Sequence, residues 1–481
     1  MLALNAQTAH KAERPERVIQ FGEGNFLRAF ADWMFSIMNE QTGFNGNVVV
    51  VQPTIKDKLE KFRRQDCLYH VNLQGLDHGK VADTCRLIDV ISRAVNPYSQ
   101  FDEYLKLAEI PEVRFIISNT TEAGITFDPS CQPGDTPAAS YPGKLTQLLF
   151  RRFRHFRGDP AKGVIILPCE LIPHNGQKLK EAIGQYIALW RLGEEFETWF
   201  HTSCRVYATL VDRIVPGFPA KTIGQITEKL QYDDQLVTQG EVFHLWVIEA
   251  PKSMAREFPA ADCGLNVQFV DDETPYHQRK VTLLNGPHTL LSPVAYLSGI
   301  DIVRDACRDE TVGSYIRKVM YEELLETLDL PKEELRRFAD SVLERFNNPF
   351  IDHQVTSIML NAFPKFATRD LPGLKIFLER KGCLPRGIVF GLAALATYYK
   401  GGHREDGASI RPEDAAETIE LLGSAWKSGN VRTVAETTLG HTGLWHEDLN
   451  AIPGLTDLLA QYLDDIRNMG MKNALKQMLA Q

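Results

Sequence analysis

The stretch from Lys280 to His288 places a base, an amide and an imidazole close together in the chain. If the stretch is helical, each residue advances by about 100°, so Asn285 lies about 140° and His288 about 80° around the axis from Lys280. One broad helix face would then carry all three side chains. The apolar residues between them predict packing against protein, and partial burial lowers the pKa of a lysine toward the range of a general base. This combination suits the removal of a proton from an alcohol.

The same stretch has a simpler interpretation that the residues alone leave open. An ordinary amphipathic helix with a solvated Lys280 and a capping Asn285 would show the same pattern. Pro287 either kinks the helix or, coming after Gly286, lies in its first turn.

A glycine turn near the N-terminus predicts a dinucleotide site. The apolar run Val18 to Phe21 leads into Gly22 and Gly24, helical spacing follows from 29 to 35, and Val48 to Val51 is a second apolar run. Strand, glycine turn, helix and strand form the start of a dinucleotide-binding βαβ unit. The first glycine permits a tight turn, the second permits close approach of a pyrophosphate, and the helix N-terminus offers free N–H groups.

Two features of this motif leave alternatives open. Leu27 stands where the third glycine of the fingerprint belongs, so a plain tight turn is the competing interpretation. An acidic ribose ligand is expected about 20 residues after the turn. Gln52 or Thr54 would have to replace it, and Lys56 and Lys58 suit a 2′-phosphate, so the choice between NAD and NADP stays open from these residues.

Polar residues follow three further predicted strands. Asn119 and Thr120, in the segment 118–124, either contact a nicotinamide ribose or form a turn that bonds its own backbone. Asn175, before Gly176, either points its amide at a substrate oxygen or belongs to an Asn-Gly turn. Asp212 and Arg213 form a charge pair within an apolar strand, which favours a structural ion pair over a place in a site.

The remaining pattern divides the chain into two domains, 1–275 and 276–481. Further strands are expected at 114–118, 164–167, 207–211, 245–249 and 267–270, alternating with helical stretches such as 178–192. Long amphipathic segments then dominate, at 312–328, 332–346, 385–399, 412–427 and 454–479, with a polar, glycine-rich loop at 401–409. We therefore expect an α/β N-terminal Rossmann-type domain with a mostly parallel sheet, followed by a mostly α-helical C-terminal domain.

Composition limits the partners of the protein. A chain of 481 residues with 44% hydrophobic and 24% charged residues is typical of a globular protein of two or three domains. A net charge of −9 argues against a nucleic-acid partner. The chain has no run of about 18 apolar residues that could form a membrane span, and residues 1–13 do not resemble a signal peptide. We therefore expect a cytoplasmic protein.

Neither a disulfide framework nor a metal site is expected. The eight cysteines are scattered without a C-x-x-C pair, which is typical of reduced thiols. His174, His288 and His353 have acidic residues nearby, yet no two have the spacing of a zinc-binding helix.

Three segments together carry a resemblance to a known family. Gly22-Glu-Gly-Asn-Phe-Leu-Arg-Ala29, the strand Leu210 to Ile214 and Lys280-x4-Asn285-x2-His288 resemble the polyol-specific long-chain dehydrogenase/reductase family, the mannitol dehydrogenase group. Their order and spacing agree across nearly the whole chain. The resemblance implies a Rossmann-type domain, a helical C-terminal domain that contributes catalytic residues, and metal-free hydride transfer with NAD.

The resemblance also implies a role for each matching residue. Lys280 corresponds to the general base, Asn175 and Asn285 to the amides that hold the substrate oxygen, and His288 to an orienting imidazole. The implied cofactor-binding residues are Ile19, Gln20, Phe21, Gly22, Glu23, Gly24, Asn25, Phe26, Leu27, Arg28, Ala29, Phe30, Asn119 and Thr120.

The implied substrate-binding residues are Asp212 and Lys365. Eight positions before Lys365, polyol-oxidising members carry an Arg and this chain has Ser357, which argues against plain mannitol as substrate. We expect a small sugar acid, with the carboxylate-binding group and the oligomeric state left open. The alternatives are a sister activity of the same family with a different pocket, and a non-catalytic nucleotide-binding relative.

Overall fold

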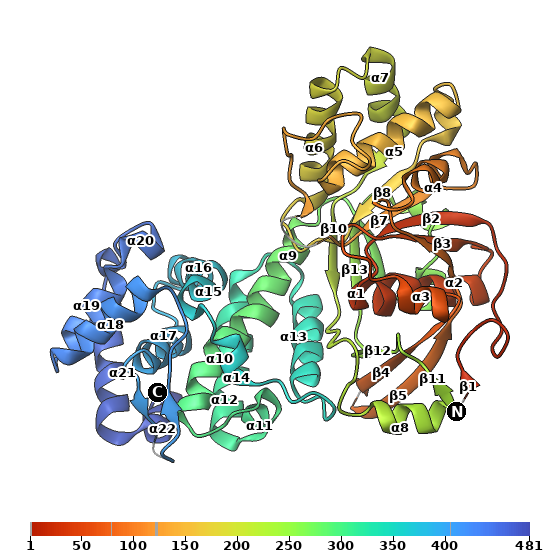
Figure 1. Cartoon of the computed structure of the whole chain (residues 1–481). Coiled ribbons are helices and arrows are strands. Elements are labelled where there is room, and N and C mark those ends of the chain that lie inside the picture. Colours follow the sequence, from red (N-terminus) through yellow and green to blue (C-terminus); the bar gives the residue numbers. More distant parts are fainter. Residues whose placement is uncertain (1, 78, 121–123, 405) are drawn as a thin grey trace. The chain divides into compact units, whose positions relative to one another are not determined.

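The computed structural model describes residues 2–77, 79–120, 124–404 and 406–481 (Figure 1). The chain forms two compact units: Met1–Gly75 with Val81–Glu273, and Leu76–Lys80 with Thr274–Gln481. No helix among the described residues is both long and apolar enough to cross a membrane.

A six-stranded parallel sheet organises the first unit (Figure 1). Its strand order is β6-β3-β2-β7-β8-β9. The strands are β2 (Glu16–Phe21), β3 (Asn47–Val51), β6 (Ile91–Val95), β7 (Phe115–Ser118), β8 (Ile165–Pro168) and β9 (Arg205–Val206). This is the order of a dinucleotide-binding fold, in which the chain reverses direction across the sheet between β2 and β7. Ligands of such folds bind at the carboxyl ends of the strands at that point.

The apolar runs predicted as strands are buried because both faces of the sheet are covered. In β3, Val48 and Val50 belong to the core on one face, whereas Val49 and Val51 belong to the core on the other face. Successive side chains of a strand point to opposite faces, so a continuous apolar run is needed where both faces are covered. Helices of the first unit include α1 (Asn25–Leu27), α2 (Trp33–Gln41), α5 (Tyr141–His155), α6 (Asn175–Leu189) and α7 (Glu194–Ser203).

Not all predicted strands join this sheet. The strands β10 (Thr209–Asp212), β13 (Leu245–Glu249) and β14 (Val267–Val270) form a separate sheet in which β10 and β13 are antiparallel. The sequence did not indicate a third sheet of β12 (Thr238–Gly240), β4 (Tyr69–Asp77) and β5 (Lys80–Ile88). Four of the nine residues of β5 are polar or charged and only Ile88 is buried, so this strand lacks the apolar pattern on which the prediction depended.

The second unit is almost entirely helical, as predicted. Its helices are α9 (Thr274–Lys280), α10 (Gly286–Leu297), α11 (Val303–Arg308), α12 (Glu310–Lys318), α13 (Lys332–Phe346), α14 (Val355–Ile358), α15 (Ala362–Arg369), α16 (Leu371–Lys381), α17 (Arg386–Tyr398), α18 (Ala416–Lys427), α19 (Val431–Leu439), α20 (Thr442–Trp445), α21 (Leu455–Met469) and α22 (Met471–Leu479). Gly470, with a φ of 79°, divides the predicted helix 454–479 into two. A short hairpin of β15 (Gly402–His403) and β16 (Ser409–Ile410) occupies the predicted loop. The expected fold class is confirmed.

Candidate active site

The glycine turn lies at the carboxyl end of β2, where the strand order reverses. Gly22 N–H donates to the carbonyl of Val51 at 3.0 Å, and Asn119 N–H donates to the carbonyl of Phe21 at 3.0 Å. The turn is therefore tied to the ends of β3 and β7. Gly22 has a φ of +129°, and a Cβ there would lie 3.0 Å from the Asn119 carbonyl oxygen, so this position requires glycine.

Gly24 precedes the first turn of a helix that runs without a break from Asn25 to Gln41. No side chain caps this N-terminus, and a Cβ placed on Gly24 would meet no atom within 4 Å. Uncapped N–H groups and open space beside the backbone suit a pyrophosphate. The turn thus fits the diphosphate of a dinucleotide.

The predicted cofactor segment divides into residues that support the turn and residues that line it. Five of them are buried in the core on either side of the sheet, namely Ile19, Phe21, Leu27, Ala29 and Phe30. Gln20 is buried and donates to the Gly22 carbonyl at 3.1 Å. Arg28 is buried and donates to the carbonyl of Leu236 and to Asn25 Oδ1. Residues 23–26 of this segment are not buried and remain the part that a ligand can reach.

A buried carboxyl group that the sequence analysis missed supports this turn. Asp32 Oδ2 accepts hydrogen bonds from the Tyr69 hydroxyl at 2.9 Å and from Gln20 Nε2 at 3.3 Å. Burial raises the pKa of Asp32 to about 7, although the hydrogen bonds and Arg28 oppose the shift. Gln20 thus links Asp32 to the backbone of Gly22.

The residues directly after β3, where a ribose ligand is expected, include no acidic side chain. The side chain of Gln52 donates to the carbonyls of Thr54 and Lys56 and accepts from Lys58 N–H, so it orders its own loop. Lys58 lies 3.4 Å from the carboxylate of Glu23 in the glycine turn.

Glu170, also missed as a site residue, joins the ends of β7 and β8. Its Oε1 accepts from the Thr120 N–H at 3.0 Å and from the Thr120 hydroxyl at 2.9 Å, while Oε2 accepts from Ser118 at 3.1 Å. Burial raises its pKa. Asn119 Nδ2 donates to the Cys169 carbonyl at 2.8 Å. Asn119 and Thr120 therefore lie at the expected sheet edge; residues 121–123 of the predicted turn lie outside the described part.

Asn175 begins α6 and is buried. Its Nδ2 donates to the carbonyls of Pro168, Glu170 and Thr209 at 2.9 to 3.0 Å, and its Oδ1 accepts from Thr209 N–H. The amide carries only two N–H groups, so the main chain already uses its donors. A substrate oxygen could bind this amide only in exchange for one of these bonds. The predicted substrate contact stays a prediction, and the geometry favours a positioning role.

Asp212 ends β10, Arg213 follows it, and both are buried. The Arg213 guanidinium donates to the carbonyls of Phe243, Ala29 and Val242 and lies 4.1 Å from the ring centre of Trp33. Main-chain carbonyls therefore hold this arginine.

In the second unit, Lys280, Asn285 and His288 lie on one continuous helix. It consists of α9, a π-helical turn from Val281 to Asn285, and α10. Gly286 N–H bonds to the carbonyl of Val281, five residues earlier. The uniform 100° spacing used for the sequence prediction is therefore wrong here, because the wider turn changes the angle between the three side chains. π-Helical turns are rare and occur often at functional sites.

The local sequence explains this π-helical turn. Pro287 lies in the first turn of α10 and has no N–H to continue the α-helical hydrogen bonds. A Cβ on Gly286 would lie 2.7 Å from Asp370 Oδ1, so glycine permits the close packing of this turn against the start of α16.

Lys280 and Asn285 are half-buried. The Asn285 carbonyl accepts from the Thr289 hydroxyl at 3.1 Å. Its side-chain amide makes no hydrogen bond to the part of the chain that the structure describes. The amide donors of Asn285 are therefore available to a ligand, in contrast to those of Asn175.

His288 is buried in an aromatic environment. Its ring centre lies 4.1 Å from that of Phe346 and 5.2 Å from that of His353. Burial, followed by the charges of His353, Arg345 and Arg369, lowers its pKa well below the usual value, although a hydrogen bond to the Leu284 carbonyl opposes this. The imidazole is therefore neutral at neutral pH.

Lys365 lies on α15, which packs against the π-helical turn and α10. Its Nζ donates to the carbonyl of Ile358 at 2.7 Å. Burial and then Arg369 lower the pKa of Lys365. Ser357 is exposed and donates to the Gln354 carbonyl at 2.7 Å.

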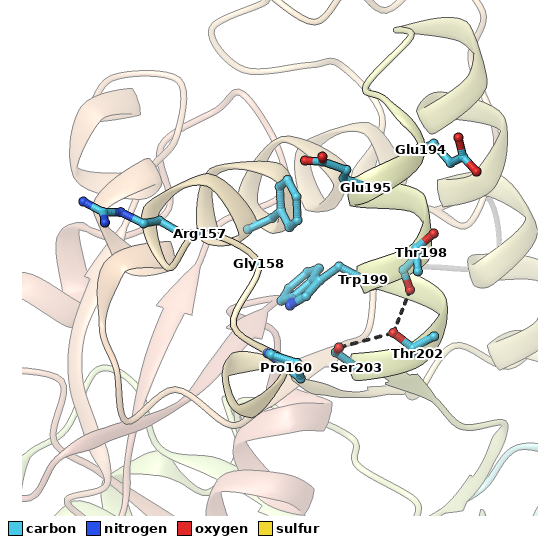
Figure 2. Close-up of a pocket in the computed structure, with 10 residues that line it drawn as sticks. Arg157, Gly158, Pro160, Glu194, Glu195, Thr198, Trp199, Thr202 and Ser203 are labelled. Carbon is cyan, nitrogen blue, oxygen red and sulfur yellow. Dashed lines mark hydrogen bonds between the residues drawn. The ribbon is translucent and has the colours of Figure 1, made fainter.

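The first unit contains a pocket of about 540 Å³. Figure 2 shows residues of α7 facing the segment from Arg157 to Pro160, with the ring of Trp199 between them. None of the predicted site residues lines this pocket.

Comparison with known proteins identifies the family. The model of the mannitol dehydrogenase Rossmann domain matches residues 16–260, and that of the mannitol dehydrogenase C-terminal domain matches residues 272–467. An altronate oxidoreductase of Phocaeicola vulgatus is 66% identical, with 100% of both chains covered. That of Bacillus subtilis is 44% identical, with 97% of this chain and 96% of its own covered.

Solved structures share the fold. A substrate-free D-sorbitol dehydrogenase superposes with a TM-score of 0.82 at 22% identity, covering 98% of this chain and 100% of its own. The mannitol 2-dehydrogenase of Pseudomonas fluorescens, in a complex with NAD and D-mannitol, has a TM-score of 0.70 at 22% identity over 100% of both chains. The resemblance seen in the motifs is thereby confirmed, and the chain belongs to the mannitol dehydrogenase family.

Proposed function

We propose that this protein is an NAD-dependent oxidoreductase that interconverts D-altronate and D-tagaturonate, a step of hexuronate breakdown. The observation that carries this proposal is the 66% identity, over the full length of both chains, to an altronate oxidoreductase. The substrate is a small sugar acid, oxidised or reduced at a secondary alcohol carbon.

The glycine turn supports NAD as the cofactor. The relative from Pseudomonas fluorescens binds NAD with the same fold. In this chain the uncapped helix N-terminus and the open space at Gly24 suit the pyrophosphate, and Asn119 and Thr120 lie at the edge where the nicotinamide ribose is expected. When bound, NAD supplies the hydride acceptor for oxidation and NADH the donor for reduction.

Lys280 is the general base in this proposal. Oxidation of the carbinol requires loss of its hydroxyl proton, which a neutral amine accepts at Nζ. In the reverse direction the ammonium returns a proton to the oxygen of the reduced ketone. The half-buried position of Lys280 on the helix with the π-helical turn suits this exchange.

Asn285 and His288 act on the substrate oxygens. The Asn285 amide has N–H donors to offer to a developing alkoxide or to the ketone oxygen. His288 is neutral, and one of its ring nitrogens donates to the Leu284 carbonyl. Its other nitrogen is therefore an acceptor for a substrate hydroxyl. Asn175 acts as a positioning residue that holds the start of α6 against β10.

We also place the enzyme in the cytoplasm. All eight cysteines are free thiols, which is typical of a reducing compartment.

Substrate specificity tests the proposal. NADH oxidation should be measured with D-tagaturonate, D-fructuronate, D-fructose and D-tagatose, and tagaturonate should give the highest kcat/KM. Preference for fructuronate or for a neutral ketose would instead identify a fructuronate reductase or a polyol dehydrogenase of the same family. Absence of NADH oxidation with every substrate, together with NADH binding, would identify a non-catalytic relative.

A further inference from the structure

Two cationic side chains lie one helical turn apart on α15. Lys365 and Arg369 are separated by four residues, so both lie on one face of this helix. Both are half-buried. Like charges at this spacing repel each other, and burial increases the cost. For each of them, burial is the first cause of a lowered pKa.

No carboxylate in the described part of the chain forms an ion pair with either cation. Asp414, the acidic group whose charge acts on Lys365, accepts from the Tyr399 hydroxyl and from the N–H of Ala415. Asp370 follows Arg369 directly, but its carboxyl is fully buried without a hydrogen bond, and burial raises its pKa well above the usual value.

The Arg369 guanidinium is held close to the predicted catalytic helix. Its Nη1 donates to the Thr289 hydroxyl at 3.1 Å, and this hydroxyl in turn donates to the carbonyl of Asn285 at 3.1 Å. The charge of Arg369 also acts on His288. The positive charge of Arg369 therefore lies near Asn285 and His288, the residues assigned to the substrate oxygens.

Most of the Arg369 guanidinium is still available for a ligand. A guanidinium has five N–H donors, and the contact with Thr289 is the one hydrogen bond that it makes within the described residues. Its planar arrangement of donors matches the two oxygens of a carboxylate. Lys365, whose Nζ has one hydrogen bond to Ile358, can add a further donor to the same group.

We propose that Arg369, assisted by Lys365, binds the carboxylate of the substrate and so selects a sugar acid over a neutral sugar. This inference rests on the proposed function and identifies the specificity-determining residue of that site.

The variant Arg369→Met tests this assignment, with Arg369→Lys and Lys427→Met as matched variants. We expect Arg369→Met to lower kcat/KM for D-tagaturonate roughly tenfold to 150-fold and to weaken inhibition by D-altronate to a similar extent. Inhibition by neutral D-altritol should change less than about threefold. Arg369→Lys should lie between wild type and Arg369→Met, because it retains the charge but loses the paired donors.

Lys427→Met removes an exposed positive charge of the same unit and should match wild type. Equal losses for altronate and altritol would overturn the assignment. If wild type reduces no tagaturonate, the proposed function fails. Calorimetry of altronate and altritol binding to wild type and to Arg369→Met then still tests the inference about the carboxylate. If wild type binds both compounds and Arg369→Met binds them with unchanged affinity, the inference is rejected.

Discussion

Asn175 and Thr209 pair in both directions. Asn175 Nδ2 donates to the Thr209 carbonyl at 2.9 Å, and Asn175 Oδ1 accepts from the Thr209 N–H at 2.9 Å. The side chain thus acts as one more strand partner for β10 at the N-terminus of α6. Because both residues are buried, loss of this amide leaves unpaired main-chain groups in the interior.

We expect Asn175→Ala to lower the free energy of unfolding by about 2 to 4 kcal/mol, measured by denaturant titration. Asn285→Ala should change stability by less than about 1 kcal/mol, because its amide has no hydrogen bond to the described residues, yet lower kcat roughly 100- to 1000-fold. If Asn175→Ala is as stable as wild type while its turnover collapses, Asn175 contacts the substrate and is not a positioning residue.

Lys280→Ala should lower turnover by at least about 100-fold while NADH binding stays nearly intact, because the base acts only on the substrate proton. Steady-state kinetics and NADH fluorescence titration measure the two effects. Lys178→Ala, at an exposed position of α6, is the control for loss of a lysine. Near wild-type turnover of Lys280→Ala would reject the assignment.

Gly24→Val should weaken NADH binding sharply, because the branched side chain occupies the space that backbone approach requires. The protein should remain folded, since a Cβ on Gly24 meets no atom within 4 Å. Gly22 is unsuitable for this test because its φ of +129° would strain any other residue. A folded Gly24→Val variant with unchanged NADH affinity would remove this turn from the cofactor site.

The pH dependence of stability should report on Glu323. Its carboxylate accepts from the N–H groups of Gly387 and Ile388 at 2.7 and 2.9 Å, in the first turn of α17, and burial raises its pKa to about 7. The folded state therefore binds a proton more tightly than the unfolded state does. This contribution to stability is fully present below about pH 4.5 and is lost as the pH rises to about 7.

The variant Glu323→Gln lacks this titration, so its stability relative to wild type should improve as the pH rises from 4.5 to 7. Thermal and denaturant unfolding at several pH values measure the difference. Glu322→Gln, at the neighbouring exposed position, is the control. A stability difference between Glu323→Gln and wild type that is independent of pH would contradict the raised pKa.

Lys365→Met should lower kcat/KM for the acid roughly tenfold and leave neutral ketoses nearly unaffected, since we propose that its ammonium assists Arg369 in binding the carboxylate. The double variant with Arg369→Met should lose less than the product of the two single losses. Equal losses on acid and neutral substrates would mean that Lys365 positions sugar hydroxyls or the fold. The bond from Lys365 Nζ to the Ile358 carbonyl makes the second role the main alternative.

The pattern of apolar and polar residues along the chain was enough to predict many of the helices and strands of this protein. The apolar runs that became β2, β3, β7 and β8, and the amphipathic period of α13, are properties of neighbouring residues, because side-chain period reflects burial on one or both faces. The order Lys280, Asn285, His288 likewise needed no tertiary information to be placed on one helix. The strand β5 was missed because its residues lack a regular apolar pattern, although its partner β4 lies just before it in the chain.

The chemistry of the side chains was decided only by packing between distant segments. The π-helical turn combines Pro287, which has no N–H, with Gly286, which packs against Asp370. The amide of Asn175 is engaged because β10 lies beside it. Arg369 points to the Asn285 turn because α15 packs on α10. Spacing in the chain determines which residues share an element, whereas burial and hydrogen-bond partners, which set pKa values and free donors, exist only in the folded protein.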